Sequence, residues 1–591
     1  MTVTVRPRGI NVPDNFDRRE FIAKAAKGGA AFTLLGAGGT LLDACGGNGS
    51  STNTSSTTTT LAPKKAVEVG VNQPPKGATL GGNITMGVEA EESGMDPTYA
   101  HFDSTGVMYA RTVYDPLAMI TFTGDVVPYL AESIVPNSTF TEWTITLRPG
   151  LTFHDGTTCD GKALTYCMQH FQSSLLTNFA LTYWKKNGVK TTGPLSCTIS
   201  MTDPWVAFPA WLAGYIGGQV AYVFSPTAYA KGETYLNTNP VGTGPFMFKK
   251  WEVGNFFETV KNPHYWRKDA LGRQLPYVDS WTFKPLPDVS SRLDALEAGT
   301  LQIMHTDDDP TIIQMEGNKK IDVLLDSEVN LGEPDCNFGM INVADPVMKD
   351  IRLRQALAYC FNQEAYSTDI GRGLLKPITG PFPAPSPYYG ATTYPAYNLA
   401  KAQALVKSWS ADHGGAKPSI KYTTTTAQTS LVSAAFVQAQ YQAAGFDVSV
   451  GTVQQSALIN DALAGGYQVF AWRQFASIDP DLNYVFWSST GGVIDFSRNH
   501  DPKVDAALDR ARQSTDPSVR VAAYREVAER FAVDLPYIWA SRDVWSIGAL
   551  KSLQNWNNST TPASTGISAN QRGCPMLSGI VWPTEIWLNN A

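Results

Sequence analysis

The apolar positions in the second half of the chain recur at the spacing of amphipathic helices. Each predicted helix has a start or stop signal beside it: an Asp or Asn cap, an Asp-Pro pair at the first turn, or a glycine after the last apolar residue. The predicted helices follow Asp350 and Asn398, run from Leu431 towards Gly445, and begin at Asp501-Pro502 and Asp516-Pro517. A strand is expected from Phe446 to Val450, directly after the third helix.

The first half of the chain is richer in strand and turn signals. Apolar and polar residues alternate from Trp143 to Leu147, and a further strand is expected from Leu151 to His154 after the Pro149-Gly150 turn. Strands that alternate with helices from about residue 83 onward predict an α/β architecture. Beyond residue 45 there is no internal repeat and no apolar segment long enough to cross a membrane.

The first 45 residues have the composition of an export signal. Arg18 and Arg19 precede a Phe and a Lys, which resembles the twin-arginine signal, and a Gly- and Ala-rich apolar run follows over residues 25–42. Residues 42–45 resemble a lipobox, whose Cys, here Cys45, receives a lipid. Residues 1–45 are therefore interpreted as a lipoprotein signal peptide, the alternative being an N-terminal anchor that is not cleaved. Residues 46–78, rich in Ser and Thr, are expected to form a flexible tether.

Length and charge restrict the classes of protein that fit. At 591 residues the chain is too long for one compact core, so two or more lobes are expected. The net charge of −7 offers no basic surface to a nucleic acid or an anionic membrane, so neither is expected as a partner. The 15 Trp, 24 Tyr and 26 Phe suit a pocket that holds varied ligands, although a large core uses the same residues.

The six cysteines after Cys45 show no close-spaced disulfide framework. Cys159 with Cys197 is the only pair that we suggest. Cys360 falls on the apolar stripe of a predicted helix, so we expect a buried thiol there.

A series of short motifs runs through the chain in a fixed order. They occupy residues 113–117, 127–133, 143–156, 239–246, 262–266, 291–299 and 350–357. Together they resemble the dipeptide/oligopeptide/nickel family of ABC-importer binding proteins, the family 5 solute-binding proteins. Most of them are interpreted as scaffold. Trp143 and Phe153 are expected in the core, Arg352 and Arg354 at the surface or in ion pairs, and residues 242–245 in a turn whose glycines need positive φ.

The resemblance implies a two-lobed, periplasmic-binding-protein-like (class II) α/β fold that holds its ligand in a cleft between the lobes. The first lobe is expected to comprise residues 79–330 and 541–591, with an inserted subdomain at about 106–225, and the second lobe residues 331–540. Chain crossings near 330 and 540 then act as a hinge. Closure of the lobes around the solute distinguishes loaded from empty protein. The protein is expected to be a monomer.

The resemblance also points to ligand contacts in the second lobe. In peptide-binding members an Asp soon after a Trp pairs with the α-amine of the ligand. Trp472 matches that Trp, but Phe475 or Ala476 stands where the Asp is expected. Because a buried ammonium needs an opposite charge, either another carboxylate replaces the Asp or the ligand has no free α-amine there. Trp472, Arg473, Gln474 and Phe475 are the candidate contacts, with Arg473 facing an anionic group of the ligand or forming a surface or inter-lobe ion pair.

Candidates in the first lobe precede Asp96-Pro97. They are Glu91, Glu92 and Met95, and either Glu is a candidate for the missing negative charge. Trp539, near the predicted hinge, completes the set.

Enzyme motifs are missing from the chain after residue 45. It has no HExxH or CxxC pair, no nucleophile elbow, no Walker A sequence and no dinucleotide fingerprint. The acidic run from Asp307 to Asp309 lacks the spacing of an EF-hand loop and is interpreted as a solvated turn. We therefore predict no catalytic residue, no metal site and no cofactor.

The main hypothesis is an ABC-transporter substrate-binding lipoprotein that captures an oligopeptide or peptide-like solute and delivers it to permease subunits. It is expected in the periplasm or on the outer face of the cytoplasmic membrane, held only by its lipid anchor. The alternatives are a binder of a metal chelate, haem or saccharide on the same scaffold, a signalling or chaperone-like lipoprotein, and an exported hydrolase.

Overall fold

The computed structural model describes residues 79–100, 102–121, 125–174, 177–214, 219–232, 234–269, 271–326, 335–384, 386–474, 477, 479–557, 576–577 and 579–589. The predicted signal and tether, with Arg18, Arg19 and Cys45, lie outside these residues. The described residues all belong to one compact unit, Lys65–Ala591. Within those ranges, every helix is too short or too polar to span a bilayer.

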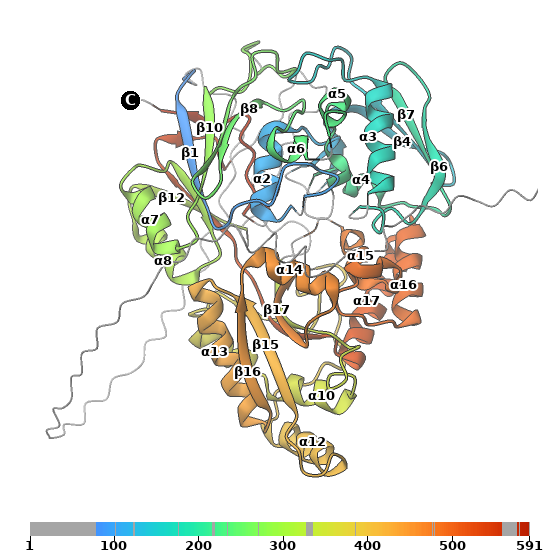
Figure 1. Ribbon diagram of the computed structural model, residues 1–591, viewed down its shortest axis with the longest axis vertical. Helices are drawn as coiled ribbons and strands as arrows, with labels where there is room; N and C mark the ends of the chain where they lie inside the picture. Colours follow the sequence, from blue (N-terminus) through green and yellow to red (C-terminus); the bar gives the residue numbers. More distant parts are fainter. Residues whose placement is uncertain are drawn as a thin grey trace, which may run out of the picture. The chain divides into compact units, whose positions relative to one another are not determined.

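A seven-stranded sheet contains the first described strand, and its strand order is β12-β19-β11-β1-β10-β9-β8. At its centre, β1 (Asn83–Val88) pairs in parallel with β10 (Ser280–Pro285) and β11 (Ile303–Thr306). The antiparallel strands are β8 (Phe246–Glu252), β9 (Phe256–Lys261), β12 (Ile321–Leu325) and β19 (Ser546–Leu550). Helices α7 (Val289–Glu297) and α8 (Asp309–Gly317) pack against β11 and β12, whereas α2 (Ser104–Val113) packs against β8 (Figure 1).

A six-stranded sheet has the strand order β14-β18-β13-β17-β15-β16. Its strands are β13 (Cys336–Ile341), β14 (Lys376–Pro377), β15 (Ser419–Thr425), β16 (Asp447–Val453), β17 (Val469–Gln474) and β18 (Tyr537–Arg542). The chain passes from the seven-stranded to the six-stranded sheet between β12 and β13 and returns between β18 and β19. The predicted lobe boundary near 330 falls in the first passage, whereas the one near 540 falls within β18, just before the second passage. The boundaries themselves stay a prediction.

The helices of this second part begin where their caps predicted. Asp350, Asn398, Asp501 and Asp516 each accept a backbone N–H at a helix start, which confirms them as caps. The helices are α10 (Ile351–Cys360), α11 (Gln363–Asp369), α12 (Leu399–Asp412), α13 (Gln428–Ala443), α14 (Gln455–Ala464), α15 (Tyr484–Trp487), α16 (Pro502–Gln513) and α17 (Pro517–Asp534), with 3-10 turns η3 (Pro480–Asn483) and η4 (Ser489–Ile494).

A four-stranded antiparallel sheet, β4-β5-β7-β6, lies in the region predicted as an inserted subdomain. It consists of β4 (Ala131–Pro136), β5 (Glu142–Leu147), β6 (Trp184–Thr191) and β7 (Ser196–Met201), and α3 (Gly161–Ser173) packs on β6 and β7. Shorter elements complete this part and the tail: β2 (Ala118–Ile120), β3 (Val126–Pro128), α4 (Phe208–Trp211), η2 (Gln219–Ala221), α5 (Pro226–Tyr229), α6 (Tyr235–Thr238), β20 (Leu553–Gln554) and β21 (Trp587–Leu588).

Two predictions about these elements are wrong. Residues 151–154 form no strand, and only a bridge between Thr152 and Thr158 is present because the Asp155 carboxylate holds the Thr157 N–H and tightens the turn. The suggested disulfide is absent: Cys159 and Cys197 are both buried free thiols. Cys360 is fully buried, as its place on the helix predicted.

The glycines of the 242–245 turn serve a different purpose from the one predicted. Gly242 and Gly244 do not have positive φ. Instead, a Cβ on Gly242 would lie 2.3 Å from the Val113 carbonyl oxygen, and one on Gly244 would lie 2.5 Å from its carbonyl carbon. Close approach to the end of α2 therefore excludes a side chain at both positions.

Among the scaffold residues, Trp143 and Phe153 are buried as predicted. Arg352 pairs with Asp350 and Asp412, also as predicted. Arg354 differs, because it is buried and its guanidinium donates to backbone carbonyl oxygens.

Candidate functional site

Arg473, at the end of β17, joins the six-stranded sheet to the loops at the edge of the seven-stranded sheet. Its guanidinium lies 2.5 Å from Asp307, 3.6 Å from Glu89 and 3.5 Å from Asp543. Glu89 follows β1, Asp307 follows β11, and Asp543 lies in the passage from β18 to β19. The strands therefore deliver three carboxylates to one guanidinium at the place where the chain passes between the sheets.

An aromatic side chain supports this ion-pair group. The guanidinium carbon of Arg473 lies 4.5 Å from the ring centroid of Trp545, and His305 stacks on the same indole at 5.1 Å. His305 is buried, and its Nε2 accepts the backbone N–H of Glu89. Burial lowers the pKa of His305 well below its usual value, so the imidazole is neutral and adds no positive charge.

Burial raises the pKa values of the surrounding carboxyl groups. The pKa of Glu89 rises to about 7, through burial and the nearby charge of Asp307. The pKa of Asp309, at the first turn of α8, rises to about 8 through burial and its neighbours Asp307 and Asp308. Burial and Asp307 likewise raise the pKa of Asp543 well above the ordinary value. The group is therefore richer in carboxyl groups than its cations can balance.

Three residues side by side on the six-stranded sheet face this group. Asn337 on β13 is the register partner of Arg473 on β17 and of Ser541 on β18, so the three side chains share one face. Ser541 is fully buried, and its Oγ has no hydrogen-bond partner among the described residues. We call Glu89, Asp307, Asp309, Asp543, Arg473 and Ser541 the junction cluster.

Trp472 lies on the opposite face of β17 from Arg473, because neighbouring side chains in a strand alternate. Its ring packs against Phe496 at 5.2 Å and is parallel to Phe470 at 6.3 Å. Gln474 is on the same face and accepts the indole N–H of Trp487. The structure thus separates Trp472 and Gln474 from Arg473, whereas Phe475 and Ala476 lie outside the described residues.

The candidates after β1 have different surroundings. Glu91 accepts hydrogen bonds from the indole of Trp251 and the backbone N–H of Gly254. Glu92 is buried, and its carboxylate would lie 2.6 Å from a Cβ on Gly106 in the first turn of α2. Burial, followed by the charge of Asp103, raises its pKa well above the ordinary value. Met95 is fully buried in the core.

A second hydrogen bond joins the two parts beside Glu92. The Gln455 side chain at the start of α14 donates to Asp103 Oδ2 over 2.7 Å, while Asp103 Oδ1 caps α2. Trp539 is fully buried within β18 and makes edge contacts with Phe338. The ligand roles predicted for these residues stay predictions.

The interpretation of residues 307–309 as a solvated turn is wrong. Asp308 caps α8 and Asp309 is only 5% exposed, while Asp307 pairs with Arg473. Long-range pairing with β17 and packing of α8 draw these carboxylates into the protein. Among the described residues, no three His, Cys, Asp or Glu side chains form a group that could hold a metal ion.

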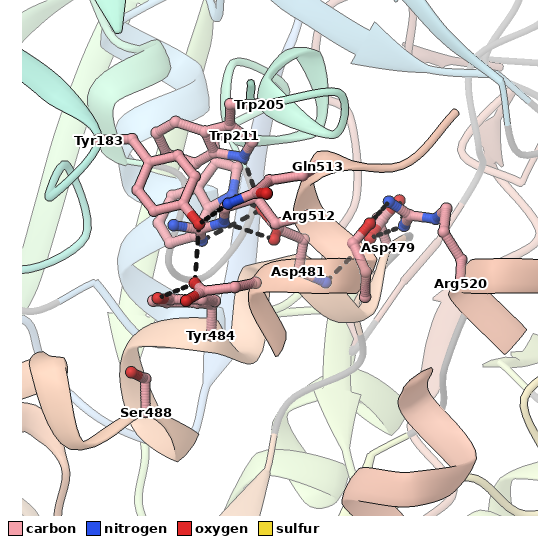
Figure 2. Close-up of polar contacts among 12 residues, drawn as sticks. Tyr183, Trp205, Trp211, Asp479, Asp481, Tyr484, Ser488, Arg512, Gln513 and Arg520 are labelled. Carbon is pink, nitrogen blue, oxygen red and sulfur yellow. Dashed lines mark hydrogen bonds and ion pairs between the residues drawn. The ribbon is translucent and has the colours of Figure 1, made fainter. Parts of the chain in front are cut away.

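A buried ion pair between Asp481 and Arg512 could not be predicted from the sequence (Figure 2). Arg512 Nε lies 2.7 Å from Asp481 Oδ1, and the indole N–H groups of Trp205 and Trp211 each donate to Asp481 Oδ2 over 2.8 Å. The two tryptophans come from the segment around α4, and the ion pair comes from η3 and α16. The only local signal was the Asp479-Pro480 pair directly before Asp481.

The fold and these contacts are those of a periplasmic-binding-protein-like α/β protein, in which the chain passes between two large sheets. Residues 125–495 match the family described as "Bacterial extracellular solute-binding proteins, family 5 Middle". The chain belongs to family 5 of the bacterial extracellular solute-binding proteins. It is therefore a solute-binding protein and not an enzyme, which confirms the resemblance, the fold class and the predicted lack of catalysis.

Three similar proteins agree with this assignment. The glutathione-binding protein GsiB of Pectobacterium atrosepticum is 24% identical over 490 residues, which cover 78% of this chain and 88% of the relative. DppA of Helicobacter pylori, solved with the peptide STSA, has a TM-score of 0.73 at 21% identity and covers 87% of this chain and 99% of its own. AgaA of A. tumefaciens, solved with agropinic acid, has a TM-score of 0.74 at 20% identity and covers 86% and 99%.

Proposed function

We propose that this protein captures an oligopeptide or peptide-like solute between its two large sheets and delivers it to the permease subunits of an ABC importer. The observation that carries the proposal is the junction cluster, where side chains from both sheets meet around Arg473. These ion pairs join residues of two separate sheets, so a solute that binds between the sheets changes their energies. Such contacts give loaded and empty protein different free energies of closure.

The relatives support a peptide-like solute. GsiB is named for glutathione, a peptide, and DppA was solved with a tetrapeptide. AgaA was solved with agropinic acid, which keeps a non-peptide solute as the second candidate. The observation that favours this second candidate is Phe475 or Ala476 at the position of the amine-pairing Asp.

A thermal-shift screen separates the two candidates. The purified protein is heated with peptides, saccharides, nickel–histidine and haem in parallel. At a hundredfold excess over Kd, a bound ligand stabilises the folded protein by about 3 kcal/mol, so a true ligand raises Tm clearly. Peptides alone should raise Tm. Stabilisation by a saccharide, chelate or haem without peptides would move the assignment to the second candidate.

We also propose that residues 1–45 export the chain and that Cys45 carries the lipid anchor. The support is the arginine pair Arg18-Arg19 and the lipobox-like residues before Cys45. Labelled fatty acid should enter the wild-type protein and not the Cys45→Ala variant. Lys in place of both arginines should keep the precursor inside the cell. Equal labelling of the Cys45→Ala variant would contradict the anchor.

A further inference from the structure

The junction cluster carries a charge imbalance. Around Arg473 stand Glu89, Asp307, Asp309 and Asp543. The charge of Arg292 acts on Glu89 and Asp307 from α7. Asp308 and Asp335 also face the cluster, while His305 is neutral and the Tyr366 hydroxyl approaches from α11. Asp103, the cap of α2, adds a further negative charge beside Glu89. Among the described residues, seven carboxyl groups therefore surround two guanidinium groups.

Two buried polar atoms of the cluster are independent evidence for a ligand. Asp309 is 5% exposed, and its Oδ1 has no hydrogen-bond partner among the described residues. Ser541 is fully buried, and its Oγ likewise has none in that part of the chain. Buried polar atoms are almost always paired, so two buried oxygen atoms without a partner in one charged cluster point to a polar ligand group as their partner.

The two residues reach the cluster from different elements, Ser541 from β18 and Asp309 from the start of α8. Ser541 shares a sheet face with Arg473, whose guanidinium contacts Asp307 and Asp543. Asp309 lies within electrostatic reach of Asp307 and of Asp543. Asp309 and Ser541 thus both neighbour the carboxylate partners of Arg473.

We propose that the junction cluster is the subsite for a primary ammonium group of the solute, with Asp309 and Ser541 as its direct acceptors. This inference rests on the proposed function, since a peptide α-amine is the ammonium that we expect. An ammonium is a compact charge with three donors, which suits a carboxylate and a hydroxyl. The subsite takes over the role of the carboxylate that is missing at residues 475–476.

The charge of the bound group has a measurable consequence. A cation beside Asp309 and Glu89 favours their ionised forms, so binding at neutral pH releases protons from the cluster. The heat of binding then depends on the ionisation enthalpy of the buffer. Affinity rises between about pH 6 and pH 7, as the carboxyl groups ionise while the α-ammonium is still mostly charged, and it falls again above about pH 8, where the free amine loses its proton.

The test uses the full exported chain and two ligand pools. One pool contains tripeptides of Ala, Ser, Leu and Phe with free amines, and the other is the same pool after N-acetylation. We expect the free-amine pool to raise Tm and the acetylated pool to have at least a tenfold lower affinity. Calorimetry in two buffers should show proton release with the free-amine pool alone.

Variants locate the subsite. Asp309→Asn and Ser541→Ala should each lower affinity for the free-amine pool, about tenfold or more for Asp309→Asn, and Asp309→Asn should reduce proton release. Asp322→Asn is the matched control, because Asp322 is on β12 with a side chain that is 50% exposed. If Asp309→Asn does not fold, Ser541→Ala still tests the subsite.

The outcomes separate this inference from the proposed function. Equal binding of both pools, or wild-type affinity in both variants, would overturn the ammonium subsite and leave peptide capture standing. Binding of neither pool would contradict peptide capture itself, and the subsite with it.

Discussion

Arg512 and Asp481 form an ion pair that solvent does not reach. Their side chains are 0% and 1% exposed, and Nε of the guanidinium lies 2.7 Å from Oδ1 of the carboxylate. The guanidinium carbon also lies 3.5 Å from the Tyr484 ring centroid and 4.2 Å from that of Trp205 (Figure 2). Because Trp205 and Trp211 donate to the same Asp481, the pair ties the inserted region to α16.

Arg512→Met should destabilise the protein strongly. Removing one partner leaves the other charge buried without compensation, which costs about 3–5 kcal/mol of unfolding free energy. Urea denaturation measures the change. Arg510→Met is the control, because the ion pair of Arg510 with Glu526 is exposed and should cost about 1 kcal/mol or less. Equal losses for the two variants would contradict the account of the buried pair.

Stability of the ligand-free protein should fall as the pH rises above neutrality. The folded-state pKa values of Glu89 and Asp309 are raised to about 7 and about 8. The folded state therefore holds protons that the unfolded state has already released, and unfolding free energy declines as pH rises towards these values. Unfolded histidines lose most of their protons between about pH 6.5 and pH 7.5, where the buried His154 and His305 add a slope of the opposite sign, so the decline is measured above about pH 7.5.

Asp309→Asn should flatten that pH dependence. A group that is protonated only in the folded state lowers the unfolding free energy by at most about 1.4 kcal/mol for each pH unit. Calorimetric unfolding between about pH 7.5 and pH 9 should give a smaller slope for Asp309→Asn than for the wild type. Asp322→Asn should keep the wild-type slope. A wild-type slope in Asp309→Asn would remove Asp309 from the titrating cluster.

Gly244→Ala should destabilise the turn before β8. The new Cβ would lie 2.5 Å from the carbonyl carbon of Val113, which is backbone and cannot rotate away. Overpacking of this kind costs about 1–3 kcal/mol. Gly317→Ala is the control, since a Cβ at that position meets no atom within 4 Å. Chemical denaturation should show a loss for Gly244→Ala alone, and no loss would contradict the close-approach explanation.

Local features of the sequence predicted much of the fold. The caps Asp350 and Asp501 could be recognised because the cap and its helix are adjacent in the chain. The junction cluster could not, because Arg473 and Asp307 are 166 positions apart and meet only through the arrangement of the two sheets. The same applies to Asp481 and Trp205, which are 276 positions apart.

Predictions of residue environment failed where a distant contact decides it. The acidic run at 307–309 has the composition of a solvated turn. In the structure, however, Asp307 pairs with Arg473 and Asp308 caps α8. Trp472 and Arg473 are neighbours in sequence, and the resemblance predicts that both contact the ligand. Strand alternation places them on opposite faces of β17, a consequence that follows once residues 469–474 are known to be a strand.

Trp472→Ala tests the other face of β17. If the Trp472 ring is a wall for the solute, its loss should weaken peptide binding by about 1–3 kcal/mol. Calorimetric titration measures Kd directly. Trp409→Ala is the control, because Trp409 lies in α12 and stacks on His413, the residue that follows that helix. An unchanged Kd in Trp472→Ala would remove Trp472 from the site.

A crystal structure of the protein with a bound free-amine tripeptide would locate the solute and its ammonium group. We expect an intact peptide between the two large sheets, with its ammonium group within hydrogen-bond distance of Asp309 and Ser541. A peptide bound elsewhere on the protein, or a cleaved one, would contradict the account.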